Sequence, residues 1–180
     1  MKFNIIIHFW GREYIKNFFD FTFPSLFFPG NISLLKKYDT TLTFCVNSKE
    51  LITIKDSLKK FNLSKFVIRF VIIDNILKNY PAKKINHFAI LKGFRSEKRK
   101  HNQIYFLILT ADDIFSNFNF KYMLRILKKN KINGILENKL LVNKDIFIKK
   151  YKKLFSNKKG VSKRKLVSIG TKNISRFQKY

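Results

Sequence analysis

Apolar residues along the first 130 positions follow two alternating patterns. One is a short, almost continuous apolar run with many β-branched residues, which is typical of a strand buried on both faces of a sheet. The other is a segment in which apolar residues recur every three or four positions, which predicts a helix with one buried face. The runs that predict strands cover residues 3–9, 41–46, 66–73 and 104–109.

Segments with helical spacing separate these runs. Asn47 or Ser48 can cap the second of the predicted helices, because both side chains accept hydrogen bonds from free backbone N–H groups. Strands and helices therefore alternate, and we expect an α/β fold with a mostly parallel sheet and helices on both faces. The predicted helices cover residues 13–23, 51–61, 85–92 and 119–127.

The pattern changes in the last part of the chain. From residue 146 to residue 180 there is no acidic residue, while Lys or Arg occupies twelve positions. An apolar stripe opposite lysines within 147–155 predicts a basic C-terminal amphipathic helix, with a loose tail after Asn157. We therefore divide the chain into an α/β domain, 1–145, and a basic segment, 146–180. The helix either docks on the domain or lies on an anionic membrane surface.

The strong positive charge must be weighed against the kind of basic residue that produces it. The formal net charge is +27, but only seven of the 38 basic residues are Arg and the rest are Lys. Lys, Asn, Ile and Phe are all abundant and all have codons rich in A and T, so codon bias can account for much of the Lys excess. Nucleic-acid readers use Arg for bidentate contacts. The composition therefore favours a solvated Lys surface that attracts phosphates over a nucleic-acid partner.

Cysteine usage and the length of the apolar runs bear on location. Cys45 is the only cysteine, so no intrachain disulfide can form, and a reducing compartment fits. The N-terminal apolar stretch is too short for a signal peptide and lacks a small-residue cleavage site. No apolar run approaches the roughly 18 residues of a membrane span. We expect a cytoplasmic protein, with peripheral contact at the inner membrane face if the basic helix is an anchor.

Polar residues gather where the predicted strands end. Ligands of open parallel sheets bind outside the carboxyl ends of the strands. The segments at the ends of the four predicted strands are residues 8–11, 47–48, 74–75 and 111–113. Asp112 and Asp113 follow the most strand-like run of the chain. Two carboxylates there can hold a hard divalent cation that bridges the two phosphates of a nucleotide diphosphate. The alternative is that Asp112 or Asp113 caps the following turn.

Signatures of other chemistries are missing. The sequence contains no GxxxxGK[ST] phosphate loop, no GxGxxG fingerprint, no nucleophile elbow and no HExxH. Cys45 lies within a predicted apolar strand, where packing explains it better than nucleophilic catalysis.

Several short motifs occur within residues 1–130. They are HFWGREY at 8–14, PSL at 24–26, PGN at 29–31, NHFA at 86–89, and the run 104–109 followed by DDIFS at 112–116. Together they resemble a family of bacterial glycosyltransferases that have the GT-A type nucleotide-diphospho-sugar transferase fold. The resemblance implies that GT-A or Rossmann-like fold for this chain.

The resemblance also implies roles in binding the donor. Trp10 and Gly11 would border the nucleotide pocket, and Asn47 and Ser48 would lie beside the base or the ribose. His87, on the helix that leads into the last predicted strand, would face the donor. Plain alternatives are a core position for Trp10 and a capping position at the surface for His87.

Asp112 and Asp113 would take the place of the family's metal-binding acidic motif, with Mn²⁺ or Mg²⁺ as the cofactor. That motif is usually Asp-X-Asp, whereas here the two acids are adjacent and follow Ala111. A transferase also needs an acceptor site and often a further carboxylate, and after Asp113 only Glu137 and Asp145 are acidic. We choose Glu137 as the catalytic base, because Asp145 can cap the basic terminal helix.

The sequence thus predicts a metal-dependent glycosyltransferase, or a truncated relative of one. It would transfer a sugar from a nucleotide-diphosphate donor to a cell-surface polysaccharide or a lipid-linked acceptor. Two alternatives stay open. One is a basic nucleic-acid-binding protein, and the other is a catalytically inactive transferase-like module held at the membrane surface by its basic helix.

Overall fold

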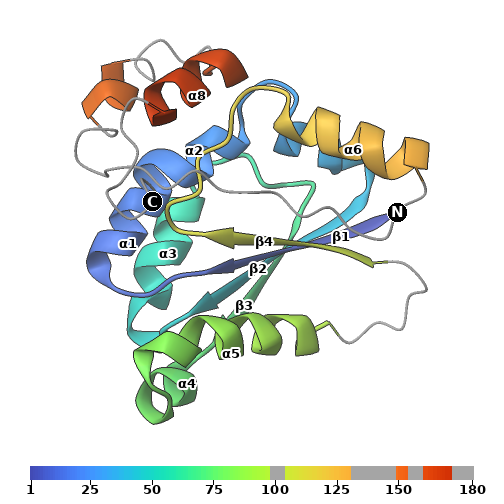
Figure 1. The fold of residues 1–180 in the computed structure, drawn as a ribbon. Helices are drawn as coiled ribbons and strands as arrows, with labels where there is room; N and C mark the ends of the chain where they lie inside the picture. The colour runs from blue at the N-terminus through green and yellow to red at the C-terminus, as the bar shows by residue number, and fades with distance from the viewer. Residues whose placement is uncertain (98–103, 131–148, 154–159, 172–180) are drawn as a thin grey trace. The chain divides into compact units, whose positions relative to one another are not determined.

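All four predicted strands are present in the structure, a computed structural model that describes residues 1–97, 104–130, 149–153 and 160–171 (Figure 1). The strands are β1 (Lys2–His8), β2 (Asp39–Val46), β3 (Val67–Ile72) and β4 (Ile104–Thr110). The α-helices are α1 (Arg12–Asn17), α2 (Phe23–Leu26), α3 (Leu51–Leu58), α4 (Asp74–Asn79), α5 (Ala82–Arg95), α6 (Asn119–Asn130) and α8 (Lys163–Thr171). A π-helix covers Phe18–Thr22, and 3₁₀ helices cover Ile32–Lys37 and Ser48–Glu50.

The described strands form one parallel sheet in the order β3-β2-β1-β4. In the central strand β1, His8 lies opposite Cys45 of β2 and Thr110 of β4. β1 and β2 are buried along almost their whole length, as expected of strands covered on both faces. The structure therefore confirms the predicted α/β class and the parallel sheet.

The chain divides into two compact units. The first contains Met1–Pro24 and Leu35–Asp113, and therefore the whole sheet. The second contains Ser25–Leu34 and Ile114–Tyr180. The predicted boundary at residue 145 falls outside the described residues and stays a prediction.

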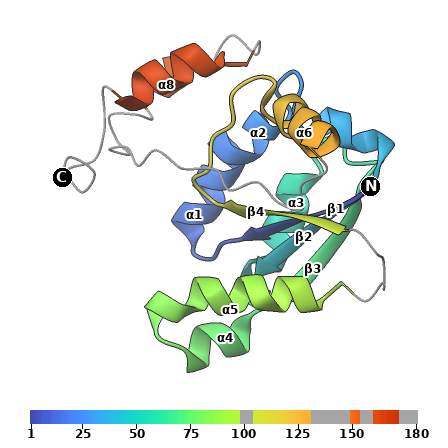
Figure 2. The same ribbon diagram turned by 45° about the vertical axis from the view of Figure 1, so that its right-hand side comes forward.

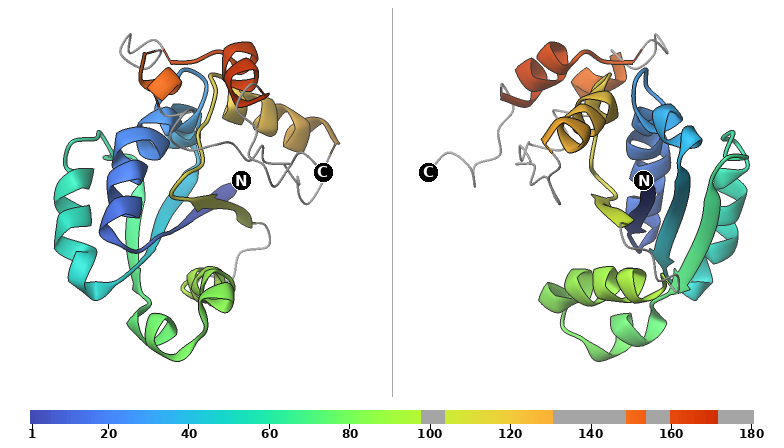
Figure 3. Two further views of the ribbon diagram at one scale, coloured as in Figure 1. Left: turned by 60° about the vertical axis from the view of Figure 1, so that its left-hand side comes forward. Right: turned by 90° about the vertical axis from the view of Figure 1, so that its right-hand side faces the viewer.

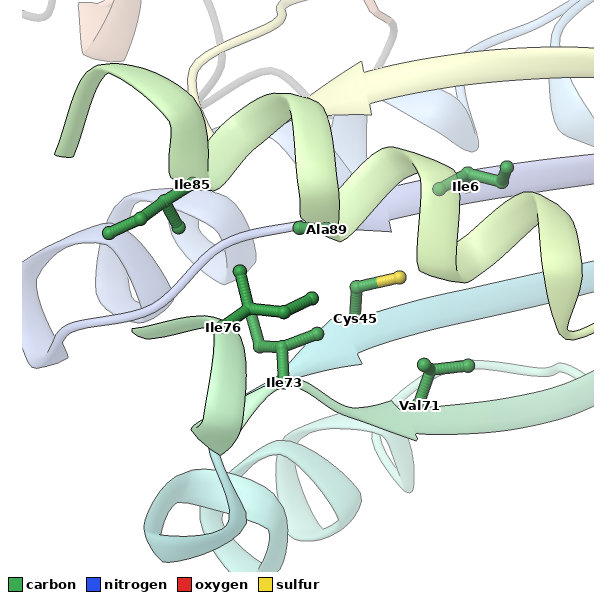
Figure 4. Packing of buried hydrophobic residues seen from close by; sticks show 7 residues of the cluster. All are labelled: Ile6, Cys45, Val71, Ile73, Ile76, Ile85 and Ala89. Atoms are coloured by element: carbon green, nitrogen blue, oxygen red, sulfur yellow. The ribbon is translucent and has the colours of Figure 1, made fainter. Parts of the chain in front are cut away.

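One face of the sheet packs on α4 and α5 through an aliphatic cluster (Figure 4). α5 approaches β1 and β2 closely, and a Cβ at Gly93 would lie 2.8 Å from Ile6 Cγ2 and 3.0 Å from Cys45 Sγ. Only glycine fits this position without displacing a neighbour. The buried members of the cluster are Ile6, Cys45, Val71, Ile73, Ile76, Ile85 and Ala89.

The opposite face packs through phenylalanine rings, in agreement with the 21 Phe of the sequence. The rings of Phe9 and Phe18 stack with centroids 4.5 Å apart, and Phe44 stacks on Phe70 at 5.7 Å. α1 and α3 lie on this side of the sheet, whereas α4 and α5 lie on the other (Figures 2 and 3). Helices therefore cover both faces, as predicted.

A polar cluster is buried near the amino-terminal ends of the strands. Glu97, with a side chain that is 3% exposed, accepts hydrogen bonds from Lys2 Nζ at 3.4 Å and from Arg69 Nη1 at 3.3 Å. Asn4 Nδ2 donates to the same carboxylate at 3.4 Å, and Asn4 Oδ1 accepts from Thr43 Oγ1 at 2.8 Å. The cluster joins β1, β2 and β3 to the segment after α5.

The second unit is organised around the buried side chain of Asn31. Asn31 Nδ2 donates to the carbonyl oxygens of Ser25, at 3.1 Å, and of Ser116, at 2.9 Å. Asn31 Oδ1 accepts from the backbone N–H of Phe120 at 3.3 Å. The amide therefore holds together two segments that are far apart in the sequence.

α8 lies where the sequence predicted a loose tail after Asn157. Ser162 precedes the helix, and its hydroxyl accepts a hydrogen bond from the backbone N–H of Lys165 at 3.3 Å, which is an N-cap interaction. Within the predicted helix at 147–155, residues 149–153 are described and are helical, with Tyr151 buried. Among the described helices, none has the length and apolar character needed to cross a bilayer.

Candidate functional site

The carboxyl ends of the four parallel strands lie at one edge of the sheet, which is where the sequence places its polar clusters. β1 leads into residues 9–11, β2 into 47–50, β3 into Asp74, and β4 into 111–113. In the sheet order, the ends of β1 and β4 are neighbours and the end of β3 is farthest from β4. Trp10, Gly11 and the two aspartates thus emerge from adjacent strands.

Gly11 connects the end of β1 to the end of β2. Its backbone N–H donates to Glu50 Oε1 at 2.8 Å. Glu50 Oε2 is buried, and no hydrogen-bond partner for it exists in the described part of the chain. Gly11 has φ 91° and ψ 137°, a conformation that is close to exclusive to glycine. This residue is therefore needed for the turn from β1 into α1.

Glu50 was not among the residues that the sequence singled out. A signal for it exists, because Asn47 and Glu50 have the spacing of a capping box, in which the acid returns to the backbone of the cap residue. Asn47 does cap the 3₁₀ helix, since its Oδ1 accepts from the N–H of Lys49 at 2.8 Å. The carboxylate of Glu50 instead accepts the hydrogen bond from Gly11, in the turn after the neighbouring strand β1. Spacing along the sequence does not reveal this contact.

Ser48 connects the end of β2 to the end of β3. Its backbone N–H donates to Asp74 Oδ1 at 2.8 Å. Hydrogen bonds from Ser48, first from its side chain and then from its backbone, lower the pKa of Asp74 and keep it ionised. The loop after β2 is therefore tied to both neighbouring strands, by Glu50 on one side and by Ser48 on the other.

Asp112 and Asp113 form a turn around Thr110. Asp113 Oδ2 accepts from the backbone N–H of Thr110 at 2.7 Å, and Asp112 Oδ1 accepts from Thr110 Oγ1 at 2.7 Å. Ala111, which lies between the end of β4 and the two aspartates in the sequence, is buried, and its backbone carbonyl oxygen accepts a hydrogen bond from Thr22 Oγ1 at 2.6 Å. Both aspartates thus bond back to Thr110 at the end of β4, whereas the alternative named from the sequence had one of them cap the turn that follows.

This turn still presents carboxylate oxygen to solvent. Asp112 is exposed, and the described residues supply no hydrogen bond to its Oδ2. Asp113 is half-buried beside it. No group of three or more His, Cys, Asp or Glu that could hold a metal ion occurs among the residues that the structure describes. The donor set is therefore two adjacent carboxylates, which fits an ion such as Mg²⁺ that takes its other ligands from phosphates and water.

Trp10 and His87 lie on different surfaces of the first unit. Trp10 is half-buried and packs against the aliphatic cluster under α4 and α5, with its ring 6.5 Å from that of His8. His87 is exposed on α5, two residues from each of the buried positions Ile85 and Ala89. It therefore lies on the side of the helix that faces away from the sheet.

The predicted catalytic base, Glu137, lies outside the described residues, as does Asp145. Cys45, by contrast, is fully buried under α5, where burial raises the pKa of its thiol to about 12. Its position in the core agrees with the packing role that the sequence suggests.

Comparison with known proteins identifies the fold. No family model matches the chain, and no curated protein matches its sequence. The apo structure of mouse xyloside xylosyltransferase 1 superposes with a TM-score of 0.52 at 10% identity, over 85% of this chain and 59% of that one. A structure of residues 1–349 of TarS from S. aureus gives a TM-score of 0.40 at 15% identity, over 79% and 40% of the two chains.

The aligned part of this chain thus spans 59% of the chain in the mouse structure. At this level of identity the likeness concerns the fold alone. This protein shares its α/β fold with the mouse xylosyltransferase structure, and its own parallel sheet is covered by helices on both faces.

Proposed function

We propose that this chain binds a nucleotide-diphosphate sugar at the carboxyl edge of its sheet and belongs to a metal-dependent glycosyltransferase or a truncated relative of one. The observation that carries the proposal is the position of Asp112 and Asp113, which are the carboxylates at the end of β4, beside the end of the central strand β1. Ligands of open parallel sheets bind at this edge. The fold shared with a xylosyltransferase supports a sugar-nucleotide ligand.

We assign the parts of the donor to the loops at this edge as follows. The loop after β2, with Asn47 and Ser48, would receive the base or ribose, and the turn at Trp10 and Gly11 would border the same pocket. Hydrogen bonds from Gly11 and Ser48 connect these loops to Glu50 and Asp74, and such connections reduce the ordering that binding of a donor would require. His87 faces away from the sheet, so any contact between it and the donor would need a ligand group that extends around α5.

In the proposed reaction, the bond between the sugar and the donor diphosphate breaks while a bond forms from an acceptor hydroxyl to the sugar. Glu137 is the residue that we propose to take the hydroxyl proton. A divalent cation, Mn²⁺ or Mg²⁺, held by Asp112 and Asp113 would neutralise charge on the departing diphosphate. The acceptor that we propose is a cell-surface polysaccharide or a lipid-linked glycan, and the basic residues 146–180 would allow contact with an anionic membrane.

A screen of nucleotide sugars tests this function. The protein is incubated with UDP-, GDP- and CDP-linked sugars with Mn²⁺ or Mg²⁺, and thermal stability and release of the nucleoside diphosphate are measured. We expect at least one donor to raise the melting temperature only when metal is present. Salt-sensitive binding of nucleic acid, with no response to any donor, would replace this proposal with the nucleic-acid alternative.

A further inference from the structure

Phe118, in the second compact unit, has a backbone conformation that is unusual for a bulky residue. Its φ is 63°, in the left-handed region that favours glycine. The residue is also 53% exposed, so burial of the ring offsets only part of the cost of this conformation. Backbone strain that stability does not explain is a reason to look for a function.

Backbone contacts within the second unit set the position of Phe118. Its N–H donates to the carbonyl oxygen of Pro29 at 2.7 Å, and the N–H of Lys121 donates to that of Gly30 at 2.9 Å. A Cβ at Gly30 would lie 2.8 Å from the Cα of Phe118, so only glycine fits where the two segments meet. The exposed ring is therefore presented by the turn at residues 29–30.

A second exposed ring and two ammonium groups lie beside the first. Tyr122 is 61% exposed, and its backbone N–H donates to the carbonyl oxygen of Phe118 at 3.0 Å. Lys121 Nζ lies 5.6 Å from the centroid of the Phe118 ring, and Lys163 Nζ lies 5.4 Å from that of Tyr122. Val167, one turn after Lys163 on α8, is 48% exposed. We call these five residues the aromatic–lysine surface.

The charge around this surface is of one sign. Among the described residues of the second unit there is no Asp or Glu, whereas Arg125, Arg164 and Lys165 add positive charge. Such a potential attracts a negatively charged partner. Aromatic rings are favourable at the headgroup level of a bilayer, and lysines there keep their stems on apolar surface and their ammonium groups in water. Rings and lysines together therefore fit the boundary of an anionic bilayer.

We propose that the aromatic–lysine surface docks on a bilayer that contains anionic phospholipids. Phe118 and Tyr122 enter the boundary between headgroups and acyl chains, while the ammonium groups beside them contact lipid phosphates. This goes beyond the membrane contact proposed for residues 146–180, because the rings belong to another segment and add apolar contact to charge. Docking of this kind needs no sugar nucleotide and no metal.

The first test removes the rings. Flotation of the full chain in EDTA measures binding to phosphatidylcholine vesicles with and without phosphatidylglycerol, which is anionic. Phe118→Gly suits the φ of 63°, and Tyr122→Ser is matched by Tyr14→Ser, since Tyr14 is 55% exposed on α1 in the first unit. We expect each loss of a surface ring to weaken binding about threefold or more, and Tyr14→Ser to change it about 1.5-fold or less. Thermal melting shows that each variant is folded.

The second test removes the charges. Lys121→Gln/Lys163→Gln is compared with Lys60→Gln/Lys65→Gln, which removes two exposed lysines of the first unit, so the net charge of the two variants is identical. We expect the first variant to weaken binding to anionic vesicles about tenfold or more and the control about threefold or less, because the attraction acts only close to the bilayer.

Equal losses in Tyr122→Ser and Tyr14→Ser, or in the two lysine variants, would overturn the proposal, and so would binding without preference for anionic vesicles. A titration with a single-stranded oligonucleotide tests the rival partner. Ring variants that weaken only oligonucleotide binding would assign the surface to nucleic acid instead. Because the assay contains neither metal nor nucleotide, Asp112→Asn should bind vesicles as the native chain does. Failure of the donor site and failure of this surface are therefore distinguishable.

Discussion

The backbone N–H of Gly11 donates to the carboxylate of Glu50 at 2.8 Å, although the two residues are 39 positions apart. This hydrogen bond ties the turn after β1 to the loop after β2 at the edge where we place the donor. The second oxygen of Glu50 is buried and has no hydrogen-bond partner within the described residues. The link between these two loops thus depends on one carboxylate.

Replacing Glu50 tests that dependence. Glu50→Ala leaves the Gly11 N–H without its acceptor and should lower the free energy of unfolding by about 1–3 kcal/mol. Glu50→Gln keeps an acceptor oxygen and should lose less. Urea denaturation measures both. Equal losses in the two variants would mean that the hydrogen bond to Gly11 contributes little.

The buried carboxylate of Glu97 should matter more to stability than an exposed one. Glu97→Gln removes the charge that faces Lys2 and Arg69 and should lower the free energy of unfolding by about 3–5 kcal/mol. The control is Asp56→Asn, whose ion pair with Lys59 is exposed and should contribute about 1 kcal/mol or less. Urea denaturation at low and high salt compares them. Similar effects would contradict the burial of Glu97.

The thiol of Cys45 should be inert in the folded protein. Burial raises its pKa from 9.0 to about 12, which lowers the thiolate fraction on the order of 1,000-fold near neutral pH. A colorimetric thiol reagent at pH 8 should therefore react through unfolding alone. Equal rates in native and urea-unfolded protein would show that Cys45 is accessible.

The same shift predicts how stability depends on pH. The unfolded thiol ionises above its ordinary pKa of 9.0, whereas the folded thiol stays protonated up to about pH 12. The contribution of Cys45 is thus complete below pH 9 and is lost as pH rises from 9 towards 12. Cys45→Ala should show a smaller decline over this interval, measured by denaturation. An identical decline would contradict the linkage.

Much of the fold was predictable because it depends on local patterns. The runs at 3–9 and 104–109 have few polar residues, and both became parallel strands of the sheet. In a parallel sheet the carboxyl ends share one edge, so the positions of Trp10 and Asp112 at that edge followed from the strands alone. The hydrogen bonds from Thr110 to the two aspartates were not predicted, because the sequence suggested only a cap on the turn that follows.

The remaining features depend on long-range contacts that no local pattern encodes. The side chain of Asn31 donates a hydrogen bond to the carbonyl oxygen of Ser116, 85 positions away in the sequence. Glu97 is paired with residues 95 and 28 positions away in the sequence. Such contacts depend on the three-dimensional fold and cannot be read from spacing along the sequence.

The most direct measurement is calorimetric binding of UDP and GDP with and without Mn²⁺. It compares the native chain with Asp112→Asn/Asp113→Asn and with Asp56→Asn, an exposed carboxylate on α3. We predict metal-dependent binding of at least one nucleotide, weakened about tenfold or more by the paired substitution and unchanged by Asp56→Asn. Binding that needs neither the metal nor the two aspartates, or no binding of either nucleotide, would contradict the assignment of this edge.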